Sequence, residues 1–167
     1  DENSKYTKGN AFATQSGWVV QAGTAANGND NASATPEVLV AIGGLAGASS
    51  TTGLRAPTIT DMRFVVGTTA ATDLTAGSSS QTIQVELTWD EGVTVVGSPT
   101  IAVTNGNEGT GTGRGPYTLV YTTTGSTANR KRFTLASQTI AANDVLTLGT
   151  ANIALAGGTI SDTVVGG

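Results

Sequence analysis

The chain contains no cysteine and no histidine, and it is poor in charged and aromatic residues. Without cysteine it can form no disulfide bond and has no thiol nucleophile. Without histidine as well, it lacks the ligands of zinc fingers and most transition-metal sites. The absence of histidine also excludes Ser-His-Asp triads and histidine-based acid–base catalysis. Charged residues make up 12% of the 167 residues, about half of the usual share. These absences together lead us to expect a protein that is not an enzyme.

Carboxylates are the acid–base groups that remain, and glycosidases use a pair of them. Here Asp90 and Glu91 are adjacent and diverge on a strand or turn. The other candidates are scattered over predicted turns: Asp61, Asp73, Glu108, Asp144 and Asp162. The glycine-rich segment 109–115 matches neither G-x-G-x-x-G nor the P-loop pattern, so we expect a hairpin tip there. We predict no catalytic residues, no metal ligands and no cofactor.

Calcium stays open as an alternative, because it needs only oxygen ligands. The densest groups of oxygen-bearing side chains are residues 27–31 and 105–108. Neither matches an EF-hand loop, and turn formation already accounts for the asparagine and glycine residues there.

The net charge is −4, and no long basic stripe accompanies it, so we expect no nucleic-acid or membrane partner. The one basic cluster, residues 130–132, lies in a predicted strand, where alternation sends Arg130 and Arg132 to one face and Lys131 to the other. We interpret it as a solvated strand face, with contact to an acidic partner as the alternative. No apolar run approaches the roughly 20 residues that would span a bilayer. Because the chain starts at Asp1 rather than methionine, we expect that a few residues or a processed leader precede it.

What the chain has in abundance is glycine, alanine, threonine and serine, and these are distributed over two regions. Residues 1–56 hold two apolar islands, 11–20 around Trp18 and 37–45, separated by a turn signal at 27–31. Residues 46–53 have the composition of a linker. We predict that residues 1–56 are an extended N-terminal arm, whose islands pair with a sheet or lie along a neighbouring molecule.

Residues 57–167 have the pattern of an antiparallel β-sandwich. In the segment 82–89, Ile83, Val85, Leu87 and Trp89 point one way and the polar residues between them point the other way. Short strands separated by turn signals are typical of sandwiches. We predict them at 58–66, 82–89, 93–96, 99–104, 117–121, 130–135, 144–148, 152–155 and 159–164. No helical periodicity is present, so the predicted fold class is all-β, with Trp89 in the core.

From about residue 56 onward, the chain resembles a bacterial Ig-like repeat module found in large cell-surface proteins and phage structural proteins. The matching segments are residues 81–95, 97–103, 121–126, 132–134 and 152–162. The resemblance implies an Ig-like sandwich with a structural or adhesive role and no catalytic residues. The chain departs from the pattern in carrying one module and a glycine-rich insertion at 105–115.

Residues 9–14, 17–19 and 37–45 resemble N-terminal segments of small structural proteins of marine tailed phages, cyanophages especially. There the resemblance implies an attachment region that precedes a displayed domain. Our leading hypothesis is a homo-oligomeric virion protein that decorates the capsid surface of a bacteriophage or forms a short head fibre. Its partners would be the major capsid protein or other virion proteins. The candidate contact residues are Phe12, Trp18, Val38, Leu39, Val40 and Ile42.

Two other classes of protein remain open. One is a secreted or bacterial cell-surface filament subunit, in which the N-terminal arm adds a strand to the sheet of the next subunit. The other is a carbohydrate-binding module, for which Trp18 and Tyr117 are the available stacking residues.

Overall fold

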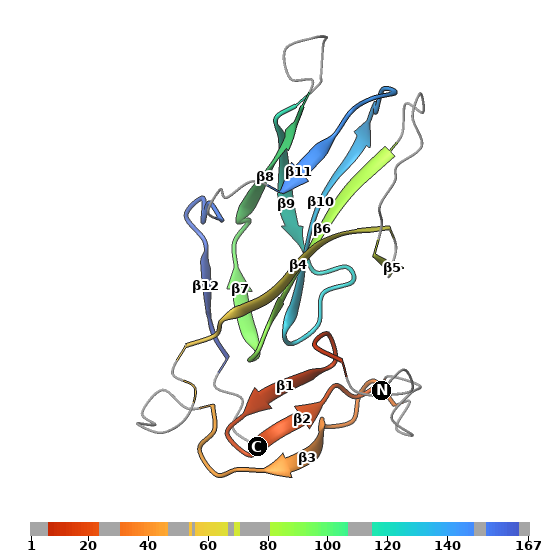
Figure 1. Ribbon diagram of the computed structural model, residues 1–167. Coiled ribbons are helices and arrows are strands. Elements are labelled where there is room, and N and C mark those ends of the chain that lie inside the picture. Colours follow the sequence, from red (N-terminus) through yellow and green to blue (C-terminus); the bar gives the residue numbers. More distant parts are fainter. Residues whose placement is uncertain are drawn as a thin grey trace.

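The computed structural model describes residues 7–23, 31–46, 54, 56–66, 69–70 (as backbone), 81–106, 115–148 and 153–163. This part of the chain is built from β-strands and turns, as the sequence predicts, and its named strands pair antiparallel (Figure 1). None of the described residues lies in a helix, and so none belongs to a helix long and apolar enough to cross a membrane.

The largest sheet has seven strands in the order β11-β8-β9-β10-β6-β4-β5. A two-stranded sheet, β7 with β12, packs against it to form the sandwich, and Ile160 of β12 contacts the shared core. The strands of the sandwich are β4 (Ile59–Val66), β5 (Thr69–Ala70), β6 (Gln81–Trp89), β7 (Val93–Val96), β8 (Thr100–Asn105), β9 (Tyr117–Thr122), β10 (Arg130–Gln138), β11 (Leu146–Leu148) and β12 (Thr159–Asp162). Of the predicted strand at 152–155, the described residues show a single bridge, between Ala154 and Thr100.

The core follows from the alternation in β6. Ile83, Val85, Leu87 and Trp89 are all buried in it, which confirms the predicted inward face. On β10, Phe133 lies opposite Val85 and also meets the ring of Tyr121 on β9 edge to face, with 6.0 Å between the ring centroids. The aromatic and β-branched side chains of neighbouring strands thus interlock across one face of the sheet.

The two N-terminal islands pair with one another. They form a three-stranded antiparallel sheet, β1 (Ala11–Thr14), β2 (Gly17–Val20) and β3 (Glu37–Ala41), in the order β1-β2-β3. We call it the N-terminal sheet; it lies below one end of the sandwich in Figure 1. The buried side chains of β1 and β2, among them Phe12 and Val20, lie outside the hydrophobic cluster of the sandwich. The molecule therefore has a second, smaller set of buried apolar residues.

Candidate docking surface on the N-terminal sheet

The N-terminal sheet is attached to the sandwich along β1, which leaves β3 on the far side. The backbone N–H of Ala13 donates to the carbonyl of Asp90 at 2.7 Å, and Ala13 forms a parallel bridge with Glu91. Strand β2 lies between β1 and β3. In the part of the chain that the structure describes, no strand pairs with the outer edge of β3. Such an edge presents backbone donors and acceptors that another chain can use.

Strand β3 and the residue after it also carry exposed apolar side chains. Val38 is 48% exposed, Val40 53% and Ile42 41%, and Leu39 is half-buried. Edge strands are usually protected by lysine, by an inward-pointing charge or by a cover. The one charged residue of β3 is Glu37, at its start. We call Val38, Val40 and Ile42 the β3 apolar strip.

Local geometry explains why β3 lies where it does. Gly17, the first residue of β2, has φ +128°, and a Cβ there would lie 2.0 Å from the carbonyl oxygen of Val40. Glycine is therefore required for β3 to approach β2 at this point. A register shift opposite Trp18 and Val19 places an extra residue, Leu39, in β3. Beyond the strand, the N–H of Ile42 donates to the carbonyl of Ser16 at 3.1 Å and extends the pairing.

The six predicted contact residues do not share one environment. Val38, Val40 and Ile42 are exposed, whereas Leu39 and Trp18 are half-buried, with Trp18 opposite Val40 in the ladder. The list needs one correction, because the side chain of Phe12 is 1% exposed. Phe12 is part of the buried interior of the N-terminal sheet and is not available to a partner. The sequence does not reveal which face of the sheet an aromatic side chain in a short apolar island will occupy.

Tyr117 needs the same correction as a sugar-stacking candidate. Its ring is buried in the core of the sandwich, and its hydroxyl lies 3.5 Å from the side-chain amide of Asn105. A buried ring cannot stack on a sugar.

The joint between the N-terminal sheet and the sandwich gathers segments that are far apart in the sequence. The carbonyl of Gly92 accepts from the N–H of Thr163 at 3.0 Å, and the carboxylate of Asp90 accepts from the N–H of Thr58 at 2.7 Å. The amide nitrogen of the buried Asn129 donates to the carbonyls of Trp89 and Lys8, at 3.1 and 3.2 Å. We call residues 90–92 the junction turn.

Glu91, in the junction turn, is a buried carboxylate, and none of the described residues supplies a positive charge that lowers its pKa. Its side chain is 1% exposed, and neither oxygen has a hydrogen-bond partner among the described residues. Burial, with the nearby charges of Asp162 and Asp90, raises the pKa of Glu91 to about 7. Sequence reasoning missed this residue, because a turn carboxylate next to Asp90 is expected to be solvated.

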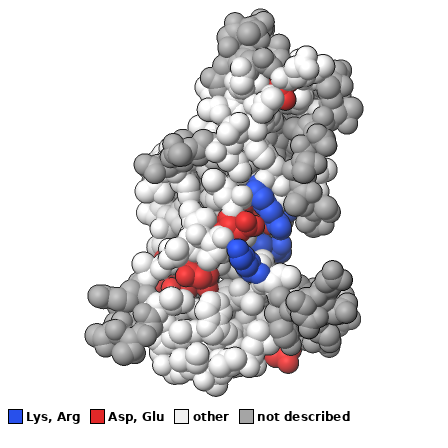
Figure 2. Space-filling model, in the orientation of Figure 1, with Lys and Arg blue, Asp and Glu red and all other residues white. Residues whose placement is uncertain are grey.

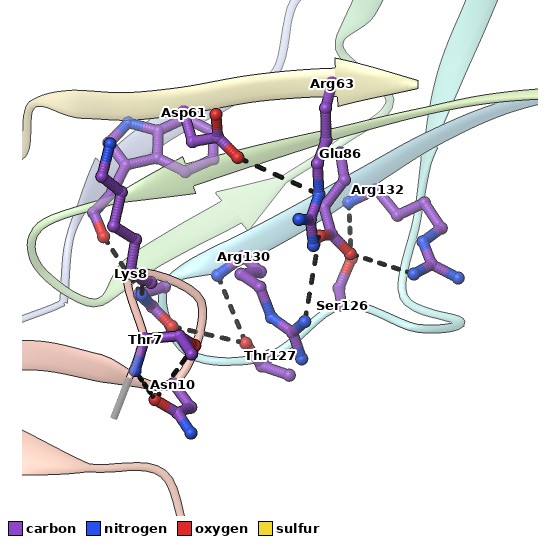
Figure 3. Close-up of polar contacts among 12 residues, drawn as sticks. Thr7, Lys8, Asn10, Asp61, Arg63, Glu86, Ser126, Thr127, Arg130 and Arg132 are labelled. Carbon is purple, nitrogen blue, oxygen red and sulfur yellow. Dashed lines mark hydrogen bonds and ion pairs between the residues drawn. The ribbon is translucent and has the colours of Figure 1, made fainter. Parts of the chain in front are cut away.

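The outer face of the large sheet carries an ion-pair cluster centred on Glu86. Arg63 of β4 and Arg132 of β10 lie opposite Glu86 of β6 in the two ladders and donate to its two carboxylate oxygens at 2.8 and 2.9 Å (Figure 3). Burial by itself would raise the pKa of Glu86. The hydrogen bonds from Arg132 and Arg63, with the charges of Arg130 and Arg63, outweigh burial and hold this pKa below its ordinary value.

The predicted alternation at residues 130–132 is confirmed by the register. Arg130 and Arg132 lie opposite Thr88 and Glu86, and Lys131 lies opposite the core residue Leu87. The solvated face we expected is wrong for two of the three, since Arg132 and Lys131 are buried. Arg132 is covered because it pairs with Glu86, and the ammonium of Lys131 donates to the carbonyl of Thr127 at 2.6 Å. Burial lowers the pKa of Lys131.

The two calcium alternatives fall mostly outside the described residues. Of segment 27–31 the structure describes Asn31, and of segment 105–108 it describes Asn105 and Gly106. Within the described ranges, no three acidic side chains are grouped so that they could hold a metal ion.

Comparison of the chain with protein-family models, with curated proteins and with solved structures finds no match.

Proposed function

We propose that the chain is a non-enzymatic structural protein that decorates the capsid of a tailed phage and docks through the N-terminal sheet. The observation that carries the proposal is the combination, on one strand, of an open edge and the β3 apolar strip. A partner strand that pairs with β3 would satisfy its outward backbone groups and bury these side chains in the same step. The likeness of residues 9–14, 17–19 and 37–45 to N-terminal segments of tailed-phage structural proteins supports a virion as the assembly.

The sandwich suits the exposed part of such a protein. Its core and the ion-pair cluster on its outer face stabilise a unit that can stand on a particle surface. The junction turn and Asn129 attach this unit to the docking sheet through hydrogen bonds. In this arrangement the N-terminal sheet contacts the major capsid protein, or sister copies on the shell, while the sandwich faces outward.

The test is binding to capsids that lack the protein, followed by sedimentation. Val40→Glu places a charge in the β3 apolar strip, where docking would desolvate it, and we expect the bound fraction to fall at least about tenfold, the equivalent of about 1.4 kcal/mol. Val145→Glu is the matched control, because Val145 is 62% exposed and lies just before β11, in the sandwich. This control should bind as the original chain does.

Normal incorporation of the Val40→Glu chain would refute docking through β3. Failure of the unmodified chain to join capsids, together with formation of polymers by the purified protein, would support the alternative. That alternative is a bacterial cell-surface or extracellular filament subunit assembled by strand exchange. The open edge of β3 is the observation that favours it.

A further inference from the structure

The cluster around Glu86 has more guanidinium groups than carboxylates. Besides Arg63 and Arg132, Arg130 approaches the same side chain, with 3.8 Å between its Nη1 and Oε1 of Glu86. The remaining acidic group is Asp61, 3.9 Å from Nε of Arg63. Among the described residues, three arginines thus face two carboxylates, which leaves one positive charge in excess. In Figure 2, basic side chains gather around acidic atoms at one place, and the other charged atoms visible on this face are acidic.

Of the three arginines in this cluster, Arg130 is the one whose side chain makes no hydrogen bond to Glu86. At 3.8 Å its contact with Glu86 is an ion pair too long for a hydrogen bond, and its buried Nε has no hydrogen-bond partner among the described residues. Within this cluster, solvent reaches Arg63 and Arg130 more than Arg132, with side-chain exposures of 37%, 24% and 7%. Both guanidinium groups approach the same atom, Oε1 of Glu86 (Figure 3).

The geometry points to Arg63 and Arg130 as a docking site for a carboxylate side chain in an acidic segment of a partner protein. A planar carboxylate matches the donor fork of a guanidinium, and here it would neutralise the excess charge. Glu86 holds Arg63 in place before the partner arrives, so less side-chain entropy is lost on binding. Contact with an acidic partner is the alternative interpretation of residues 130–132 in the sequence. In this proposal the contact involves one arginine on β4 and one on β10.

A polyanion fits the site less well than a single acidic segment. The chain carries a net charge of −4, so with one positive charge in the cluster the rest of the molecule carries −5. A nucleic acid that extended beyond the cluster would meet this negative charge, whereas one or two carboxylates in a short segment would not. The site lies apart from β3 and does not rest on the proposed capsid role.

The experiment is an NMR titration of the full chain with the peptide acetyl-Gly-Glu-Glu-Gly-amide. We expect shifts of the Nε–H signals of Arg63 and Arg130 and of the backbone near residue 130. The dissociation constant should be about 30 mM or weaker, because one or two exposed ion pairs supply at most about 2 kcal/mol. Arg130→Gln should weaken binding about fivefold or more, with a smaller loss in Arg130→Lys, which keeps the charge but not the fork. Thr147→Glu, a same-sign charge change on β11, should bind as the original chain does.

Three controls decide the result. The peptide acetyl-Gly-Gln-Gln-Gly-amide must not shift these signals, and equal shifts with it would overturn the assignment. Equal affinity for sulfate would mean an adventitious ion only, and tighter binding of a single-stranded oligonucleotide would mean a phosphate site; both outcomes also overturn it. Because the side chain of Arg130 is partly exposed and its contact with Glu86 is a 3.8 Å ion pair, its variants should keep the amide spectrum of the folded chain. A loss of binding can then be assigned to the missing guanidinium.

Discussion

At the scale of single residues, the most unusual group in the molecule is the carboxyl of Glu91. It is buried beside Asp90 and Asp162, and in the part of the chain that the structure describes no positive charge lowers its pKa. A carboxyl group whose pKa rises on folding stabilises the folded state while it is protonated. This contribution is complete below the unfolded pKa of about 4.5 and is lost as the pH rises through about 7.

Glu91→Gln should therefore change the pH dependence of stability. The amide stays neutral, so we expect the variant to match the original chain near pH 4.5 and to exceed it above pH 8, by up to about 3 kcal/mol. Denaturant unfolding of both chains from pH 4 to 9 measures this difference. A constant difference over that range would show that Glu91 does not titrate between the two pKa values. The lowered pKa of Glu86 also makes stability fall at acidic pH. This effect is the same in both chains, so it cancels in the comparison.

At the scale of elements, the position of β3 depends on Gly17. Replacing it with alanine brings a Cβ against the backbone of β3, and alanine also disfavours φ near +128°. We expect Gly17→Ala to cost at least about 2 kcal/mol locally and to free β3 from β2. Hydrogen exchange should report this as lost protection at the N–H of Ile42, which donates to Ser16.

Gly44→Ala is the matched control for this prediction. Gly44 also has a positive φ, +71°, but a Cβ there meets nothing within 4 Å. This variant should carry the backbone strain alone, about 1 kcal/mol, and keep Ile42 protected. Equal loss of protection in both variants would show that the clash with β3 is not the cause.

The elements also show what sequence patterns can and cannot reveal. The strict alternation of β6 predicted its inward face because a half-buried strand repeats every two residues. The same rule placed Glu86 on the outer face but could not show that it is buried, because the arginines that cover it come from β4 and β10. The exposure of Val38 and the burial of Phe12 likewise depend on which edge of the N-terminal sheet meets the sandwich. Long-range pairing of this kind leaves no local signal.

At the scale of the whole molecule, the two sets of buried residues should respond separately to damage. Phe12→Ala should destabilise the N-terminal sheet by about 3 kcal/mol and raise amide exchange at Val19 and Val20, with little change at Leu119 in the sandwich. Phe133→Ala, in the main core, should raise exchange in the sandwich itself. Amide-resolved exchange of the two variants makes the comparison. If Phe12→Ala instead raised exchange everywhere by the same factor, the chain would unfold as one cooperative unit.

The junction turn also bears on the order in which the chain folds. Its partners are Ala13 near the start of the chain, Thr58 and Thr163 near its end, so each of these bonds closes a long loop. Contacts of high sequence separation form late, because the loop-closure entropy must be met first. During synthesis the turn cannot be completed until its last partner, Thr163, has left the ribosome. Bonds formed so late are largely absent from the folding transition state. The junction turn should therefore affect the rate at which the N-terminal sheet separates from the sandwich more than the rate at which the two come together.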